Sequence, residues 1–197
     1  MAEGDITVAK LLTLEYERLK EEQKTRIGFR DNLVYATLAS MAAVIAATLS
    51  ARGQANLALL LPPVALLLGW TYLVNDEKIS AAGRYIRTEL APRLAADLPP
   101  GTPVFGWESF HRGDRRRRTR KVLQLAVDLG MFCVAPAAAL VVFWASSPRS
   151  AAYLTISVVE GLAVLGLAVH LVLYADLTRH RDEDGVASAP DAPGPAA

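Results

Sequence analysis

A strongly basic segment between two pairs of long apolar stretches constrains this chain more than any other feature. Residues 76–121 hold 11 of the 21 Lys and Arg residues, whereas charges are almost absent from two stretches before this segment and two after it. Apolar stretches of about 18 residues or more are typical of membrane-spanning helices. Because cationic segments resist translocation, the pattern predicts a polytopic membrane protein with residues 76–121 in the cytosol.

The predicted fold is all-α, with four transmembrane helices arranged as two hairpins and with amphipathic cytosolic helices. The short loops within the hairpins hold Arg52 and Arg149, and the other 19 Lys and Arg residues lie elsewhere. Both termini are therefore expected in the cytosol, with the protein in the plasma (inner) membrane. We divide the chain into a cytosolic amphipathic helix (1–31), a first transmembrane hairpin (32–75), a cytosolic helix, loop and polybasic segment (76–121), a second transmembrane hairpin (122–175) and a disordered tail (176–197).

The N-terminal part carries an apolar stripe at steps of three and four residues, which predicts an amphipathic helix over residues 6–31 that ends at Arg30 and Asp31. The stripe contains Leu12, Tyr16, Leu19, Gln23 and Ile27. We expect it to pack against a second cytosolic helix. A coiled coil that binds a partner or forms an oligomer, and a helix lying on the membrane surface, are the alternatives.

The second cytosolic helix is predicted over residues 77–97, with Asn75 and Asp76 at its N-cap and a bend at Pro92. Its apolar stripe contains Ile79, Ala82, Ile86, Leu90 and Leu94. The following loop holds Phe105, Trp107 and Phe110. We expect these aromatic side chains to be interfacial anchors or part of a domain core, with a ligand platform as the alternative.

Small residues and prolines mark the predicted spans. Ala39, Ala43 and Ala47 recur every four residues in the first span, and we expect this face to pack inside the bundle. Pro62 and Pro63 interrupt the second span, and Pro136 lies near the middle of the third. Each proline removes a backbone hydrogen bond and kinks a helix, so these positions are static kinks or hinges.

Glu160 is the strongest single indication of a site. It lies about eight residues into the fourth span, roughly 12 Å deep at 1.5 Å per residue. An acidic group at that depth must face protein or water, or be protonated. Three roles remain open: an ion or proton pathway, a buried structural hydrogen bond, and a contact with a partner subunit. Ser157 and Gly161 form a small-residue pair suited to a helix contact.

Asp128 and His170 form the second candidate site. Each lies a few residues inside the cytosolic end of its span, at a depth of roughly 8–10 Å. Because the third and fourth spans are antiparallel, a hydrogen bond between carboxylate and imidazole would join them. A metal-binding or acid–base role would need further ligands, which the sequence does not offer.

The basic run before the third span has a predicted role as an orientation signal that contacts anionic lipid headgroups. It does not resemble a nucleic-acid-binding module, because no aromatic residues are interleaved. The run contains Arg115, Arg116, Arg117, Arg118, Arg120 and Lys121.

Two segments, Glu21–Leu33 and Asn75–Ser80, resemble uncharacterised small integral membrane proteins of high-GC bacteria. The resemblance implies a plasma-membrane setting, and it implies no activity.

We therefore expect a non-enzymatic oligomeric scaffold or effector, with a cytosolic helical layer that contacts copies of the chain or a cytosolic protein. The alternative is an oligomeric ion or proton pore, or a transporter-like protein, that uses Glu160. A membrane enzyme is the third hypothesis, which the sequence disfavours because it contains no HExxH, GxSxG, P-loop, GxGxxG or CxxC pattern. No cofactor and no metal are expected.

Overall fold

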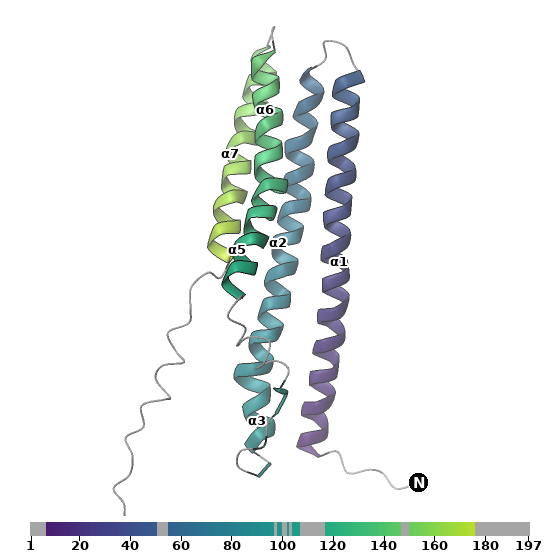
Figure 1. The fold of residues 1–197 in the computed structure, drawn as a ribbon, viewed down its shortest axis with the longest axis vertical. Coiled ribbons are helices and arrows are strands. Elements are labelled where there is room, and N and C mark those ends of the chain that lie inside the picture. Colours follow the sequence, from purple (N-terminus) through teal and green to yellow (C-terminus); the bar gives the residue numbers. More distant parts are fainter. Residues whose placement is uncertain are drawn as a thin grey trace, which may run out of the picture.

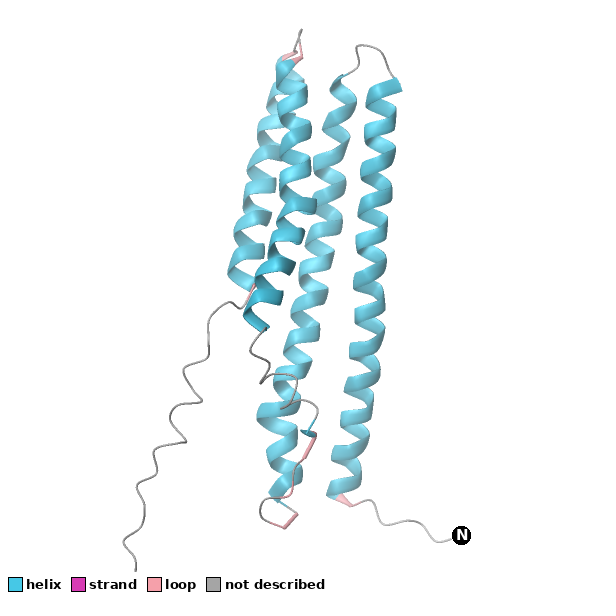
Figure 2. Cartoon of the chain, in the orientation of Figure 1, coloured by secondary structure: helices cyan, strands magenta, loops and turns pink. Residues whose placement is uncertain are grey.

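The computed structural model describes residues 7–50, 55–96, 98–99, 102, 104–106, 117–146 and 150–175, and every regular element within them is a helix (Figure 2). Four helical segments are long and apolar enough to cross a membrane: Val8–Ser50, Ala55–Ala96, Thr119–Ala145 and Ala151–Tyr174. The predicted all-α class with four candidate spans is thus confirmed. Large apolar side chains such as Leu38, Ile45, Val141 and Leu165 are exposed on the spans, as expected where lipid surrounds the helices.

The first half of the chain forms α1 (Val8–Ser50), the 3₁₀ helix η1 (Ala55–Leu60), α2 (Leu61–Tyr85), the π-helix η2 (Ile86–Leu90) and α3 (Ala91–Ala96). The second half forms α5 (Arg117–Leu129), the π-helix η3 (Gly130–Val134), α6 (Ala135–Ala145) and α7 (Ala151–Tyr174).

The helices run side by side, and α1 and α2 are longer than the others (Figure 1). The four candidate spans lie side by side in the upper part of the view, and α1 and the α2–η2–α3 segment extend well below the lower ends of α5 and α7 (Figure 1). We call this two-helix extension the arm, and define it as residues 8–31 packed against residues 76–96. The arm and the first hairpin are therefore built from the same two helical segments.

Two predicted helix boundaries are wrong. Arg30 and Asp31 do not end a helix, because α1 continues through them to Ser50. Asn75 and Asp76 do not cap a new helix, because α2 passes through both and buries Asn75. These polar residues lie within continuous helices, and the side chains of Arg30, Asn75 and Asp76 have partners on the neighbouring helix.

The seam between α1 and α2 follows the heptad spacing of four and three residues. On α1 the buried or partly buried positions include 12, 16, 19, 23, 26, 30, 33 and 37, and on the arm part of α2 and η2 they include 76, 79, 83, 86 and 90. The predicted stripe of α1 is confirmed as far as Gln23, but Ile27 is exposed and Arg26 takes the next place.

The small-residue face of the first span does not pack inside the bundle. Ala39, Ala43 and Ala47 are exposed, and the buried side of α1 contains Leu33 and Thr37 instead. The polar Thr37 is satisfied on this buried side because its hydroxyl donates to the Leu33 carbonyl oxygen at 2.7 Å.

Each of the four prolines within the described helices lies beside a change of helix type. Pro62 and Pro63 lie in the first turn of α2, directly after η1. Pro92 and Pro136 are each the second residue after a π-helix, η2 and η3 respectively. A proline ring clashes with the carbonyl group four residues earlier, and a wider turn before it relieves that clash. Whether Pro62, Pro63 and Pro136 act as hinges stays a prediction.

The membrane core closes around Phe132, which is fully buried between α2 and α7. Gly69 allows this approach: a Cβ atom there would lie 2.8 Å from Leu167 Cδ2 and 2.9 Å from Phe132 Cδ1. Such distances are too short for carbon atoms, so these helices pack closely because position 69 has no side chain.

The arm has its own small core of Leu12, Ile86 and Leu90. Phe105 closes it by stacking on Tyr16, with ring centroids 3.9 Å apart, and adopts a left-handed backbone with a φ of 50°. The prediction that Phe105 belongs to a domain core agrees with this packing. Trp107 and Phe110 lie outside the described residues.

Candidate functional site

A belt of polar contacts joins α1 to α2 where the arm meets the four-helix region. Asn75 Nδ2 donates to the Arg26 carbonyl oxygen at 2.7 Å, and Gln23 Nε2 donates to the Ile79 carbonyl oxygen at 3.0 Å. The Arg30 guanidinium bonds to the Asp76 carboxylate at 3.0 Å. We call these residues, Gln23, Arg26, Arg30, Asn75 and Asp76, the clasp. Polar groups inside a heptad seam favour one register because any slip would leave them unpaired.

The ion pair of the clasp is partly shielded from solvent. The side chains of Arg30 and Asp76 are 27% and 33% exposed. Burial alone lowers the pKa of Arg30, but its hydrogen bond to the Asp76 carboxylate and nearby negative charge raise it, and the net pKa shift is upward. Arg30 therefore keeps its charge in this position.

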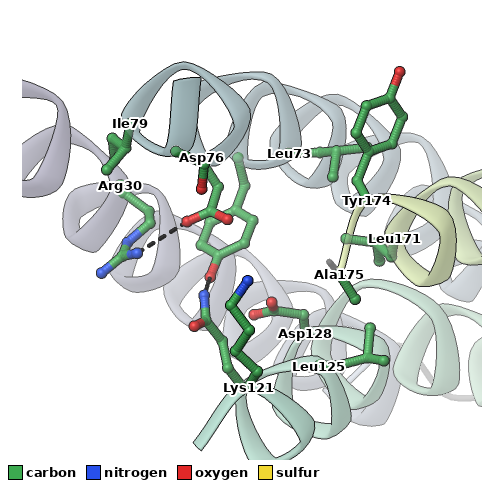
Figure 3. Close-up of a pocket in the computed structure, with 13 residues that line it drawn as sticks. Arg30, Leu73, Asp76, Ile79, Lys121, Leu125, Asp128, Leu171, Tyr174 and Ala175 are labelled. Carbon is green, nitrogen blue, oxygen red and sulfur yellow. Dashed lines mark hydrogen bonds and ion pairs between the residues drawn. The ribbon is translucent and has the colours of Figure 1, made fainter. Parts of the chain in front are cut away.

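Arg30 and Asp76 of the clasp line a cavity of about 220 Å³ between α1, α2, α5 and α7 (Figure 3). Charged groups of both signs line it: Arg30 and Asp76 from the clasp, Lys121 and Asp128 from α5. The charged ends of Asp76, Lys121 and Asp128 are turned toward the same space in Figure 3. Apolar side chains complete the wall on the side of the spans: Leu73, Leu125 and Leu171.

A short hydrogen-bond network crosses this cavity. Gln124 Nε2 donates to the Tyr72 hydroxyl oxygen at 3.2 Å, and the Tyr72 hydroxyl also interacts with the Asp128 carboxylate. Since the oxygen of Tyr72 accepts from Gln124, its proton can be donated to Asp128. The network gives the buried Asp128 carboxylate a hydrogen-bonding partner and connects α5 to α2.

The structure separates the predicted pair Asp128 and His170. Asp128 lines the cavity, whereas His170 Nδ1 lies 2.8 Å from the Gly166 carbonyl oxygen of its own helix. The imidazole ring also packs edge-on against Trp70 and stacks near Tyr174. The prediction of a hydrogen bond between Asp128 and His170 is therefore wrong. Asp128 interacts with Tyr72 instead, and His170 contacts the backbone of its own helix.

Glu160 lies far from the cavity. It precedes Leu171 by eleven positions on α7, roughly 16 Å along the axis. Its carboxyl oxygen Oε2 is shielded, and within the described residues no hydrogen-bond partner reaches it. The neighbouring Ser157 is fully buried, and its hydroxyl oxygen accepts a hydrogen bond from Trp144 Nε1 of α6 at 2.9 Å. The predicted helix contact at Ser157 thus exists, and Glu160 flanks it.

The basic run is described only in part. Arg115 and Arg116 lie outside the described residues, and the side chains of Arg117 and Arg118 do as well. Arg120 lies on the exposed surface of α5, and Lys121 lines the cavity. Contact of this run with anionic headgroups stays a prediction.

Among the residues that the structure describes, no cluster of three or more His, Cys, Asp or Glu side chains could hold a metal ion.

The clasp was not predicted from the sequence, although Gln23 had a place in the predicted apolar stripe of α1. The segments Glu21–Leu33 and Asn75–Ser80 contain every clasp residue. The signal that could have revealed it was a polar residue at a heptad position.

In comparisons with protein-family models, curated proteins and solved structures, nothing matched this chain.

Proposed function

We propose that the chain is a non-enzymatic scaffold in the plasma (inner) membrane. Its arm lies in the cytosol and assembles with the arms of other copies of the chain. The observation that carries this proposal is the continuity of α1 and of α2–η2–α3 from the spans into the arm. Continuous helices joined by the clasp couple the arm to the membrane with little freedom at the junction.

The surface of the arm supports assembly. Val8, Leu11 and Leu14 follow one another at three-residue steps on α1, and they are 65%, 52% and 46% exposed. Apolar side chains grouped at the end of a solvent-facing helix are stabilised when another helix covers them. Two helices alone bury one narrow seam, and pairing two arms into a four-helix bundle would cover a second one. A cytosolic protein is the alternative occupant.

The test uses these exposed residues, because Leu12 and Ile86 form the inner core of the arm and changing them would unfold it. The triple variant Val8→Ser, Leu11→Ser, Leu14→Ser should lower the mass of the purified protein in detergent, measured by light scattering, while its helix content stays the same. The matched control is Leu38→Ser, an exposed leucine within a span. A wild-type mass equal to that of a monomer would contradict self-assembly. Equal masses for the wild type and the triple variant would contradict it as well.

Glu160 supports a second candidate, an oligomeric ion or proton pore. A shielded carboxyl oxygen inside a span, with no hydrogen-bond partner in the described part of the chain, is an unusual and costly arrangement. Reconstituted in liposomes, the wild type should then show a conductance or proton flux that Glu160→Gln abolishes. Equal flux in the two proteins would eliminate this candidate.

A further inference from the structure

The cavity between the clasp and α5 differs from an ordinary ion-pair cluster because it retains volume. Its approximately 220 Å³ exceeds by far the space that one water needs. Pockets for drug-sized ligands are larger, about 300–1,000 Å³. The size therefore suits a small polar group of a few heavy atoms.

The charges of the wall exclude two simple classes of ligand. A metal cation would meet the guanidinium of Arg30 and the ammonium of Lys121, and the described residues offer no cluster of metal ligands. A purely anionic group would meet the carboxylates of Asp76 and Asp128. A group that carries a negative and a positive charge side by side is complementary to both sets.

The wall also keeps hydrogen-bonding capacity after its internal contacts are counted. Arg30 contacts Asp76 at 3.0 Å and Asp31 at 3.7 Å, whereas a guanidinium has five donors and a carboxylate about four acceptor sites. Ser80 and Gln124 add a hydroxyl and an amide to the same lining. A bound phosphate could therefore reach several donors, and an ammonium could reach carboxylate oxygens.

The position of the cavity indicates where such a group comes from. Arg30 and Asp76 lie at the two ends of the transmembrane hairpin that the sequence predicts over residues 32–75, while Leu125 and Leu171 line the cavity from within the candidate spans Thr119–Ala145 and Ala151–Tyr174. A ligand with a polar end at the clasp would thus have an apolar surface beside it, as a membrane lipid requires.

We propose that this cavity binds a zwitterionic phosphate–ammonium group, with Arg30, Lys121 and Gln124 contacting the phosphate and Asp76 and Asp128 contacting the ammonium. The group can be the headgroup of a phosphatidylethanolamine lipid or a soluble phosphoethanolamine, which share this chemistry.

Native mass spectrometry of the full chain in mild detergent tests the proposal with three probes: phosphatidylethanolamine, phosphatidylglycerol with the same acyl chains, and soluble phosphoethanolamine. We expect phosphatidylethanolamine to bind about tenfold more tightly than phosphatidylglycerol, the order of one charge-assisted contact. Displacement of the lipid by soluble phosphoethanolamine would identify the headgroup as sufficient, and failure to displace it would identify the lipid as the source. Equal binding of the two lipids, or no binding of any probe, would overturn the proposal.

Variants locate the site. Lys121→Gln and Asp128→Asn should each weaken phosphatidylethanolamine binding about tenfold by removing one charged contact. The matched controls are Lys78→Gln and Glu77→Gln, which are exposed on α2 beside the same junction but outside the lining, and should bind as the wild type does. Should Asp128→Asn fail to fold, the lipid comparison on the wild type and Lys121→Gln still decides. Unchanged binding in Lys121→Gln would contradict the assignment.

Discussion

Arg30 Nη1 and Asp76 Oδ1 lie 3.0 Å apart although 46 residues separate them along the chain. This contact joins the two long helices at the junction between the arm and the four-helix region. It also forms part of the wall of the cavity, so one pair of residues serves both the register of the helices and the proposed ligand site.

We expect a measurable coupling between Arg30 and Asp76. In a double-mutant cycle with Arg30→Ala and Asp76→Ala, the coupling energy should be about 0.5–1 kcal/mol, because the pair is only partly shielded. Reversible unfolding in mixed detergent micelles would measure it. The control cycle is Arg18 with Glu21, which lie 3.1 Å apart but are 82% and 70% exposed. A coupling there as large as at the clasp would show that the junction has no special role.

Gly69 and Gly166 should respond in opposite ways to the same substitution. Gly69→Ala places a Cβ atom against Phe132 and Leu167 and should destabilise the protein by about 1–3 kcal/mol. Gly166→Ala, also within a span, meets nothing within 4 Å and should be neutral or stabilising by up to about 1 kcal/mol. Thermal unfolding of the two variants in one detergent provides the comparison. Equal effects would mean that α2 and α7 are farther apart than described.

The Tyr85 hydroxyl donates to Glu15 Oε1 at 2.7 Å, and this hydrogen bond raises the pKa of Tyr85 above its ordinary value of 10.0. A raised folded-state pKa means that the contribution to stability is complete below pH 10.0 and is lost as pH rises through the folded-state value. Glu15→Gln should lower the pKa of Tyr85, followed as the tyrosinate absorbance that Tyr85→Phe removes. The control Glu17→Gln, exposed on the same helix, should leave the titration as it is. If the pKa of Tyr85 is the same in Glu15→Gln as in the wild type, the hydrogen bond between Tyr85 and Glu15 is refuted.

At position 105 we expect glycine to destabilise the protein less than alanine does, the reverse of the usual order. Both Phe105→Ala and Phe105→Gly lose the stacking on Tyr16, but alanine keeps the cost of the left-handed backbone while glycine does not. We expect the glycine variant to be more stable than the alanine variant by about 1 kcal/mol. Limited proteolysis at the loop, with thermal unfolding of the arm, would measure the difference. The reverse order would show that Phe105 does not hold this conformation.

The long-range distribution of charge and hydropathy was sufficient to predict the class of the fold. Four apolar stretches with almost no charged residues predict four spans, because each is long enough to cross the hydrocarbon core, where charged side chains are costly. The stripe from Leu12 to Gln23 likewise predicts the inner face of the arm, since heptad spacing follows from helix geometry.

The partners of individual polar residues could not be predicted in this way. Sequence reasoning placed helix ends at Arg30 and Asn75 and paired Asp128 with His170, since a polar residue beside an apolar stretch resembles a boundary and two polar residues at similar depth resemble a pair. In the folded chain Arg30 bonds to Asp76, Asn75 to the Arg26 backbone, and Asp128 interacts with Tyr72.

The sequence by itself thus determined which segments are helices and how many can cross a membrane, because both depend on local composition and period. Only the tertiary structure decided that α1 and α2 run unbroken into the arm, which face of α1 is buried, and that Arg30, Asp76, Lys121 and Asp128 surround one cavity. The physical reason is that these features depend on the rotation and register of packed helices, and those are fixed by side-chain contacts between residues far apart in the chain.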